Sequence, residues 1–390
     1  MTRRPSVVGG VDRLLTLFQR VDGAFLAGRF ALFVPVLVFS QLLDAPEFGR
    51  FSTRYHAFLF AGNLALWGAH DALLVRAGAT SGRVTQLILF YAVAVAATGS
   101  AGYLGDPSGL LVCLFVFLYR PLYLLLVTVY RDAPGAYRTL TVALVAAMLA
   151  LVVPLPDPAW RLGGAAAVTL AFQALLVART PGLLALRPAL FLRRLGEEYG
   201  YAGNHVLSSF FIQGSLFVFS LLAREEPFAA AAQLAYLLNV VLVAQGLLYR
   251  LAVHRFARRS EGVGGRLRVF VLLSLGVAAA AVVGVALVGP RAERLLFGRA
   301  AALPALQGPL IWILLVHSLN YPLAGLLVGS GRVRSQLAVS AASAAVLVAA
   351  LLLLPDRGSP WSYALALSIA TSAAVVGRLV AARPLLRPPP

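Results

Sequence analysis

Two arginines stand inside long apolar stretches and are the first candidates for chemistry. Arg29 lies near the start of its stretch, and Arg120 lies near the middle of another, directly before Pro121. Because an ionisable side chain in the bilayer core is costly, each is a candidate functional group. A guanidinium presents paired donors that match phosphate oxygens. The alternatives are that Arg29 extends to the membrane surface, and that Arg120 makes a structural contact beside Pro121.

A carboxylate and two imidazoles are the candidates for proton transfer. Asp71 ends an apolar stretch and is a candidate for lining the substrate cavity, where it either carries a coupling proton or pairs with Arg29 or Arg76. His205 opens a stretch and His317 lies within one. Histidine titrates near neutral pH, so both are candidates for proton coupling. The competing interpretation is that each is a hydrogen-bonded packing residue.

Four side-chain amides also lie in apolar stretches. They suit sugar hydroxyls, and they equally suit hydrogen bonds between helices. The four are Asn63, Gln213, Asn239 and Gln245. The sequence shows no phosphate-cradling glycine-rich loop, no paired-carboxylate active site and no metal-ligand cluster. We therefore expect no metal, no cofactor, no ATP hydrolysis and no enzymatic activity.

Composition indicates which elements position these residues. Hydrophobic residues make up 60% of the 390 residues, charged residues only 12%, and the mean hydropathy is +0.84. Soluble domains are about half apolar and a quarter charged, so the sequence predicts an all-α polytopic membrane protein. A spanning helix needs roughly 20 mostly apolar residues. About twelve stretches meet this condition: 24–43, 56–75, 84–104, 109–129, 139–155, 162–178, 203–223, 228–249, 267–289, 305–329, 333–354 and 361–381.

Arginine placement predicts the orientation of these spans. The net charge is +18, and the sequence contains no Lys. The arginines sit in short runs between apolar stretches, which argues against nucleic-acid binding and for membrane topology. If both termini are in the cytoplasm, most arginines fall on the cytoplasmic side. This count places Arg378 with the cytoplasmic arginines that follow the last span. Segment 186–199 is interpreted as an interfacial helix, with an irregular basic linker as the alternative.

An internal repeat divides the chain into two six-helix lobes. The predicted units are 1–180, a cytoplasmic linker at 181–202, and 203–390. Phe48 follows an acidic turn after the first span, as Phe228 does after the seventh, and Pro121 and Pro322 occupy the fourth and tenth spans. Matching positions in each half predict a parallel pseudo-repeat, with chance similarity between apolar helices as the alternative.

Two stretches resemble a known family. "DAPEFGRFSTRYHAFLFAGNLALWGAHDALLVR" (44–76) resembles the first outer loop and second helix of bacterial polysaccharide-transport proteins, the lipid-linked oligosaccharide flippases. "ERLLFGRAAALPALQGPLIWILLVHSLNYPLAGLLVGSGRVRSQ" (293–336) is similar to their ninth to eleventh spans. The chain departs from the family at 228–236, which is Ala-rich where relatives show a Gly-Tyr-like pair.

The resemblance implies a transporter of the multidrug/oligosaccharidyl-lipid/polysaccharide superfamily. Its two lobes would face a central cavity that opens alternately to each side of a bacterial inner membrane. The implied substrate is a polyprenyl-pyrophosphate-linked oligosaccharide, which Arg29 would hold by its pyrophosphate. A polysaccharide polymerase and other glycan-assembly proteins are the expected partners. The alternatives are a drug or ion antiporter of the same superfamily and a membrane polysaccharide polymerase or glycosyltransferase.

Overall fold

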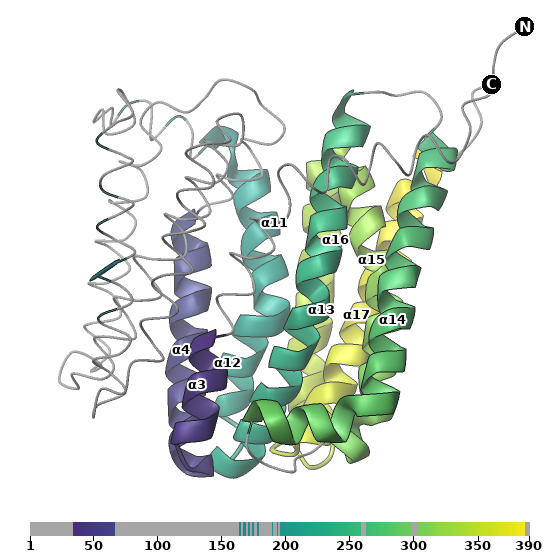
Figure 1. The fold of residues 1–390 in the computed structure, drawn as a ribbon. Coiled ribbons are helices and arrows are strands. Elements are labelled where there is room, and N and C mark those ends of the chain that lie inside the picture. Colours follow the sequence, from purple (N-terminus) through teal and green to yellow (C-terminus); the bar gives the residue numbers. More distant parts are fainter. Residues whose placement is uncertain are drawn as a thin grey trace, which may run out of the picture.

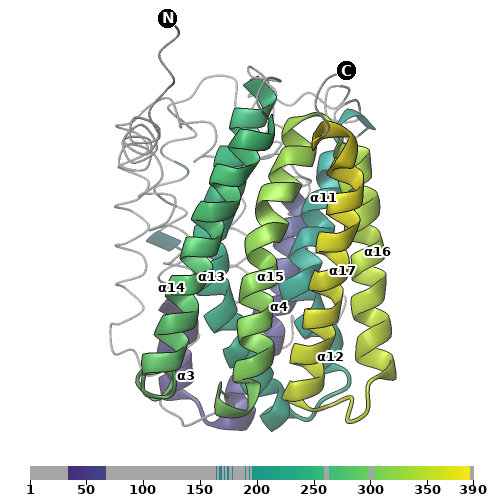
Figure 2. The ribbon, with the colours of Figure 1, turned by 90° about the vertical axis from the view of Figure 1, so that its right-hand side faces the viewer.

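The computed structural model describes residues 34–66, 196–258, 263–297 and 303–386, and the single residues 164, 167, 168, 171, 174, 178, 189 and 193. Within these ranges all regular structure is helical. The helices run nearly parallel along one bundle (Figures 1 and 2). They are α3 (Val34–Leu42), α4 (Ala45–Leu66), α11 (Tyr199–Ser209), the π-helical η3 (Phe210–Gly214), α12 (Ser215–Ser220), α13 (Glu225–Arg258), α14 (Val263–Phe297), α15 (Leu303–Gly329), α16 (Val333–Leu353) and α17 (Pro360–Leu386).

The described helices confirm an all-α membrane protein. Four of them are long and apolar enough to cross a bilayer, and α13, which bends by 40° beside Asn239, is a fifth if counted as one span. Helices α15, α16 and α17 match the predicted spans 305–329, 333–354 and 361–381 closely. Helix α14 is longer than its predicted span, and its last turns lie across the end of the bundle (Figure 1).

The predicted loop at 44–55 is wrong, because α4 begins at Ala45. The backbone N–H of Glu47 donates to Asp44 Oδ1 at 2.8 Å, and the backbone N–H of Asp44 donates to Glu47 Oε2 at 3.4 Å. This reciprocal arrangement is a capping box, which satisfies amide groups that the first helical turn leaves without partners. The polar residues that suggested a loop are therefore the first turns of a helix.

The predicted span 203–223 is a nearly continuous rod with one wide turn. Helix α11 passes directly into η3, and η3 passes into α12. Gly214 fits this turn because a Cβ atom there would lie 2.3 Å from the ring of Phe210. In the preceding linker, the described residues Ala189, Arg193, Gly196 and Glu197 are helical.

Close helix packing builds the C-terminal half. Helix α15 contacts α13, α14 and α17, and α16 packs on α17 and α11. Small residues allow this approach, as is common between membrane helices. A Cβ atom on Gly329 would lie 2.7 Å from the carbonyl oxygen of Val253, and one on Gly325 would lie 2.7 Å from Ala252 Cβ. Helix α4 from the predicted N-terminal lobe rests against α11, η3, α12 and α13.

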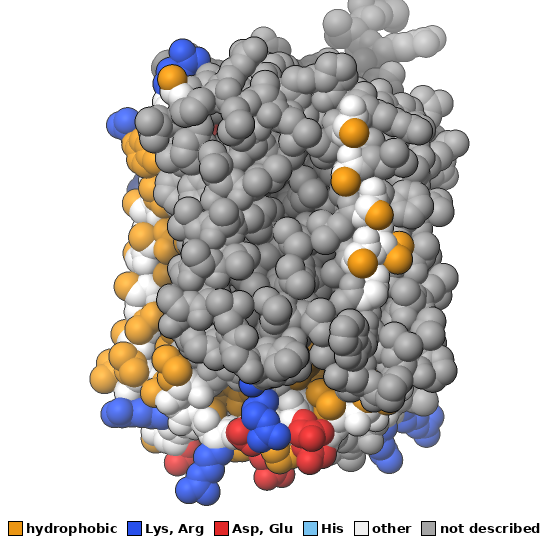
Figure 3. Space-filling model, turned by 90° about the vertical axis from the view of Figure 1, so that its left-hand side faces the viewer, with side chains coloured by type: hydrophobic (Ala, Val, Ile, Leu, Met, Phe, Trp, Pro, Cys, Tyr) orange, Lys and Arg blue, Asp and Glu red, His pale blue; other side chains and the backbone are white. Residues whose placement is uncertain are grey.

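The two ends of the bundle differ in charge. We call the end that carries Asp44, Glu47, Glu225 and Glu226 the acidic end; Figure 3 shows its mixed acidic and arginine side chains below an apolar flank. We call the opposite end, where α13, α15 and α17 finish and α16 begins, the basic end. Arginine placement predicts that the acidic end faces outside.

Candidate functional site: the acidic-end junction and the Arg378 cluster

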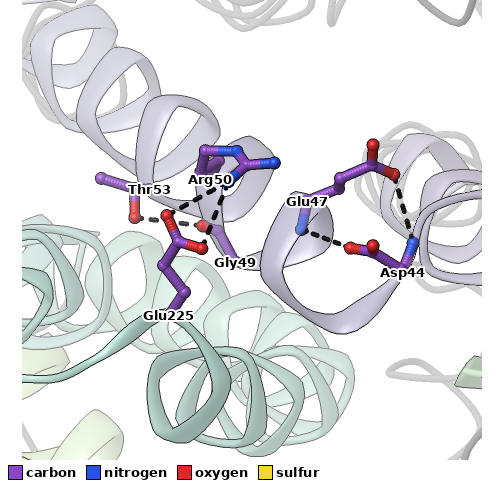
Figure 4. Close-up of polar contacts among 6 residues, drawn as sticks. All are labelled: Asp44, Glu47, Gly49, Arg50, Thr53 and Glu225. Carbon is purple, nitrogen blue, oxygen red and sulfur yellow. Dashed lines mark hydrogen bonds and ion pairs between the residues drawn. The ribbon is translucent and has the colours of Figure 1, made fainter.

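Helices α4 and α13, which occupy matching places in the predicted repeat, meet at the acidic end. Arg50 Nη1 lies 3.2 Å from Glu225 Oε2 and 3.3 Å from Oε1, across 175 positions of sequence (Figure 4). Both side chains are about half exposed. The hydroxyl of Thr53 donates to the carbonyl oxygen of Gly49 at 3.1 Å on the same face. We call Gly49, Arg50, Thr53, Glu225 and Phe228 the acidic-end junction.

Backbone contact underlies this ion pair. A Cβ atom on Gly49 would lie only 2.7 Å from the carbonyl oxygen of Glu225. Only glycine allows two helices to approach this closely without displacement. The two predicted lobes therefore touch through main chain as well as through charge.

An aromatic layer lies beneath the junction. The Phe48 ring is 6.4 Å from the Tyr236 ring, and the His56 ring stacks on Tyr236 at 4.9 Å. On the C-terminal side, Phe219 contacts Tyr363 at 5.1 Å. Such ring pairs stabilise a contact beyond the area that they bury. The largest fully buried side chains of the described residues all lie in this region: Phe39, Phe48, Tyr55, Phe219, Phe228 and Tyr363.

A pocket of about 310 Å³ lies beside the ion pair. Its lining combines both predicted lobes with the turn between α12 and α13. The lining residues are Gly49, Arg50, Thr53, Arg54, Ser220, Ala223, Glu225 and Phe228. The junction is therefore bordered by an open pocket, while the aromatic layer beneath it belongs to the same buried core as the C-terminal half.

A second polar group lies inside the C-terminal half, about two turns before the ends of α15 and α17 at the basic end. Arg378 of α17 is 5% exposed. Its Nε donates to Gln336 Oε1 at 2.9 Å, one Nη donates to Asn320 Oδ1, and the other Nη donates to Ser340 Oγ at 3.4 Å. We call these residues, with Asn204, the Arg378 cluster. Because a buried charge is costly without partners, these neutral oxygens must supply its stabilisation.

Further hydrogen bonds fix which way each amide points. Gln336 Nε2 donates to Asn204 Oδ1 at 3.0 Å, which turns Gln336 Oε1 toward Arg378. Asn320 Nδ2 lies 3.5 Å from His317 Nδ1, which turns Asn320 Oδ1 toward Arg378. Oxygens from α15 and α16 are thereby aimed at one guanidinium.

The structure brings few of the sequence-predicted residues together. His317 is buried and joins the Arg378 cluster through Asn320. Gln213 is buried in the π-helical turn η3, Asn239 lies half-buried at the bend of α13, and His205 lies half-buried in α11. Asn63 lies in α4. Arg29, Asp71 and Arg120 lie outside the described residues.

Sequence reasoning missed two features. Arg378 is not a cytoplasmic arginine as counted; it is buried because its span continues to Leu386. The available signal was its position inside the predicted stretch 361–381. The Arg50–Glu225 pair had no local signal, since its partners are far apart in sequence.

No protein-family model matches this chain, and no curated protein matches it. Solved structures do match. A eukaryotic MATE transporter superposes with a TM-score of 0.66 at 14% identity, covering 95% of this chain and 96% of that one. The lipid II flippase MurJ, in an inward closed conformation, superposes with a TM-score of 0.65 at 13% identity, covering 93% and 87%.

A third match names the superfamily. An inward-facing multidrug resistance MATE transporter of the MOP superfamily superposes with a TM-score of 0.60 at 12% identity, covering 92% of this chain and 94% of that one. This chain has the fold of the MATE and MurJ transporters. At these identities the likeness establishes the fold, in agreement with the predicted polytopic helical architecture.

Proposed function

We propose that this chain is a flippase that moves a polyprenyl-pyrophosphate-linked oligosaccharide from the cytoplasmic to the outer leaflet of a bacterial inner membrane. Transport proceeds by alternating access and serves assembly of a capsule, exopolysaccharide or O-antigen. The observation that carries the proposal is the acidic-end junction, where matching helices of the two predicted lobes close one end of a MATE-like bundle.

The junction has the properties of a reversible gate. Its ion pair is half exposed, so it contributes little to stability and separates readily. When the lobes rock apart, Arg50 and Glu225 separate, Gly49 leaves the carbonyl of Glu225, and the aromatic layer beneath parts toward the outer leaflet.

Charge favours an anionic substrate over a cationic drug. Helices α11, α12, α15, α16 and α17 contain no Asp or Glu, and α13 contains none after Glu226. The basic end carries arginines such as Arg255, Arg332 and Arg334. A basic rim raises the local concentration of an anionic head group. Arg29 and Arg120 remain the proposed phosphate contacts, with Asn63, Gln213 and Asn239 for sugar hydroxyls and Asp71, His205 and His317 for proton coupling.

Loss of the chain provides the first test. We expect the gene-deleted host to accumulate sugar-loaded carrier on the cytoplasmic leaflet and to lose surface glycan. A polymerase would instead leave single repeat units on the outer face, and an antiporter would change drug resistance with glycan unaltered. Arg29→Ala and Arg120→Ala test the phosphate contacts, and normal glycan export at normal expression in both would reject them.

A crosslink tests the gate directly. In a Cys113→Ala background, the pair Arg50→Cys and Glu225→Cys should form a disulfide that stops export, and reductant should restore it. The matched control pair is Val339→Cys and Gly377→Cys within the C-terminal half, because a Cβ atom on Gly377 would lie 3.6 Å from Val339 Cβ, which is within disulfide reach. Crosslinking the control should leave export unchanged. Export through an oxidised Arg50–Glu225 crosslink would contradict the gate.

A further inference from the structure

The Arg378 cluster is a converging set of oxygens around a single cation. Asn320 Oδ1, Gln336 Oε1 and Ser340 Oγ come from α15 and α16 and all accept from the guanidinium of Arg378 on α17. The amide nitrogen of Asn320 points away toward His317, and that of Gln336 donates to Asn204 Oδ1 at 3.0 Å and to Ser340 Oγ at 3.1 Å. Hard cations in proteins bind carboxylate, carbonyl and amide oxygens, and this cluster offers amide and hydroxyl oxygens without a carboxylate.

Among the described residues, no carboxylate contacts Arg378 or balances its charge. The helices that carry the cluster contain no Asp or Glu at all. Since a buried ion normally has a counter-ion, a lone guanidinium held only by neutral oxygens indicates a site arranged for a positive charge.

We propose that Asn320, Gln336 and Ser340 form a cation cage that Arg378 fills with its own guanidinium, so the C-terminal half carries a tethered cation there and needs no exchangeable Na⁺ or K⁺ in that position. Asn204 and His317 hold the cage amides in their orientation. The inference concerns the chain's own residues and does not depend on which substrate is moved.

Chemical rescue of the purified full-length protein tests the cage. Thermal unfolding is followed in detergent with NaCl, KCl, choline chloride or low millimolar methylguanidinium chloride. We expect Arg378→Ala to unfold several degrees below the wild type in choline. Methylguanidinium should recover part of that loss in a saturable way, and it should not stabilise the wild type.

Arg332→Ala is the matched control. Arg332 is also an arginine at the basic end, and it donates to the carbonyl oxygen of Ala381 at 3.4 Å. Its removal leaves no converging oxygens, so methylguanidinium should not rescue it. Adding Asn320→Leu to Arg378→Ala should abolish the rescue, because one wall of the cage is lost.

Two results would overturn the proposal. The first is an Arg378→Ala protein that is as stable as the wild type or is not rescued by any of the cations. The second is a wild type stabilised by Na⁺ or K⁺ over choline, with the effect removed by Gln336→Ala, since the cage would then bind a free ion. If Arg378→Ala does not fold, Arg378→Lys and Arg378→Gln decide: Lys must give the higher unfolding temperature in choline, and equal temperatures or the reverse order reject the cage.

Discussion

Two glycines approach a neighbouring helix equally closely, in regions that differ in every other respect. A Cβ atom on Gly49 would lie 2.7 Å from the carbonyl oxygen of Glu225, and one on Gly329 would lie 2.7 Å from that of Val253. Gly49 is on α4 and faces α13 across the predicted boundary between lobes. Gly329 ends α15 and faces α13 inside the C-terminal half.

The surroundings determine what each contact does. Beside Gly49 lie a half-exposed ion pair and a pocket of about 310 Å³, together with the buried rings of Phe48 and Phe228. Beside Gly329 lie buried side chains of the same half, including Val253, Val328 and Phe256. A packed interior transmits strain because it has no room to relax, whereas the boundary between the two predicted lobes can relieve the strain if the lobes separate as units. The same steric clash should therefore unfold one region and open the other.

The largest effect is expected for Gly329→Val. The added carbons meet the Val253 carbonyl and Phe256 Cβ at under 3 Å, and overpacking a filled core costs about 1–3 kcal/mol or more. We expect a clear fall in the unfolding temperature of the purified protein, measured by a thermal shift assay. The side of the membrane to which the protein opens should not change. Gly276→Val, at a helix position with nothing within 4 Å of the added Cβ, is the control. Equal stability of the two variants would contradict the packing argument.

Gly49→Val should have the second largest effect, on conformation and not on stability. The clash with the Glu225 carbonyl is relieved when the lobes separate at the acidic end. We expect a spin-label distance between position 54 on α4 and position 226 on α13 to lengthen, while the unfolding temperature changes much less than for Gly329→Val. A short, unchanged distance together with strong destabilisation would show that this boundary is as rigid as the core.

Tyr363→Phe should give an intermediate loss at the acidic end but inside the C-terminal half. The hydroxyls of Tyr363 and Ser215 lie 3.1 Å apart in a buried place, and removing one partner costs about 1 kcal/mol. Ser215→Ala should cost a similar amount, and the double variant should cost less than their sum. Additive losses in chemical unfolding would show that the two groups do not interact.

Glu225→Gln should give the smallest change. An exposed ion pair contributes about 0–1 kcal/mol, so unfolding should barely respond. The spin-label distance of the wild type should lengthen slightly at high salt, because salt screens exposed charges. In Glu225→Gln that salt response should disappear. A salt response of equal size in the variant would show that the ion pair does not help to hold the gate closed.

Local sequence patterns predicted the helices well, but they could not predict contacts between residues that are far apart in the sequence. Apolar length located α15, α16 and α17 closely, since bilayer thickness fixes that length. The capping box at Asp44 and Glu47 is readable from spacing, yet the polar residues around it suggested a loop. Arg378 was visible inside an apolar stretch, but its partners on α15 and α16 follow only from how the helices pack. Arg50 and Glu225 meet because two halves of the chain come together.

The π-helical turn at Phe210–Gly214 determines the direction in which the side chains of the following helix, α12, point. A π-helical turn holds one residue more than an α-helical turn, and each α-helical residue advances the side chains by about 100°. If the same five residues formed an ordinary α-helical turn, the extra residue would rotate α12 by about that angle. Ser215 and Phe219 would then turn away from Tyr363. The packing of this part of the aromatic layer therefore depends on the one extra residue in the π-helical turn.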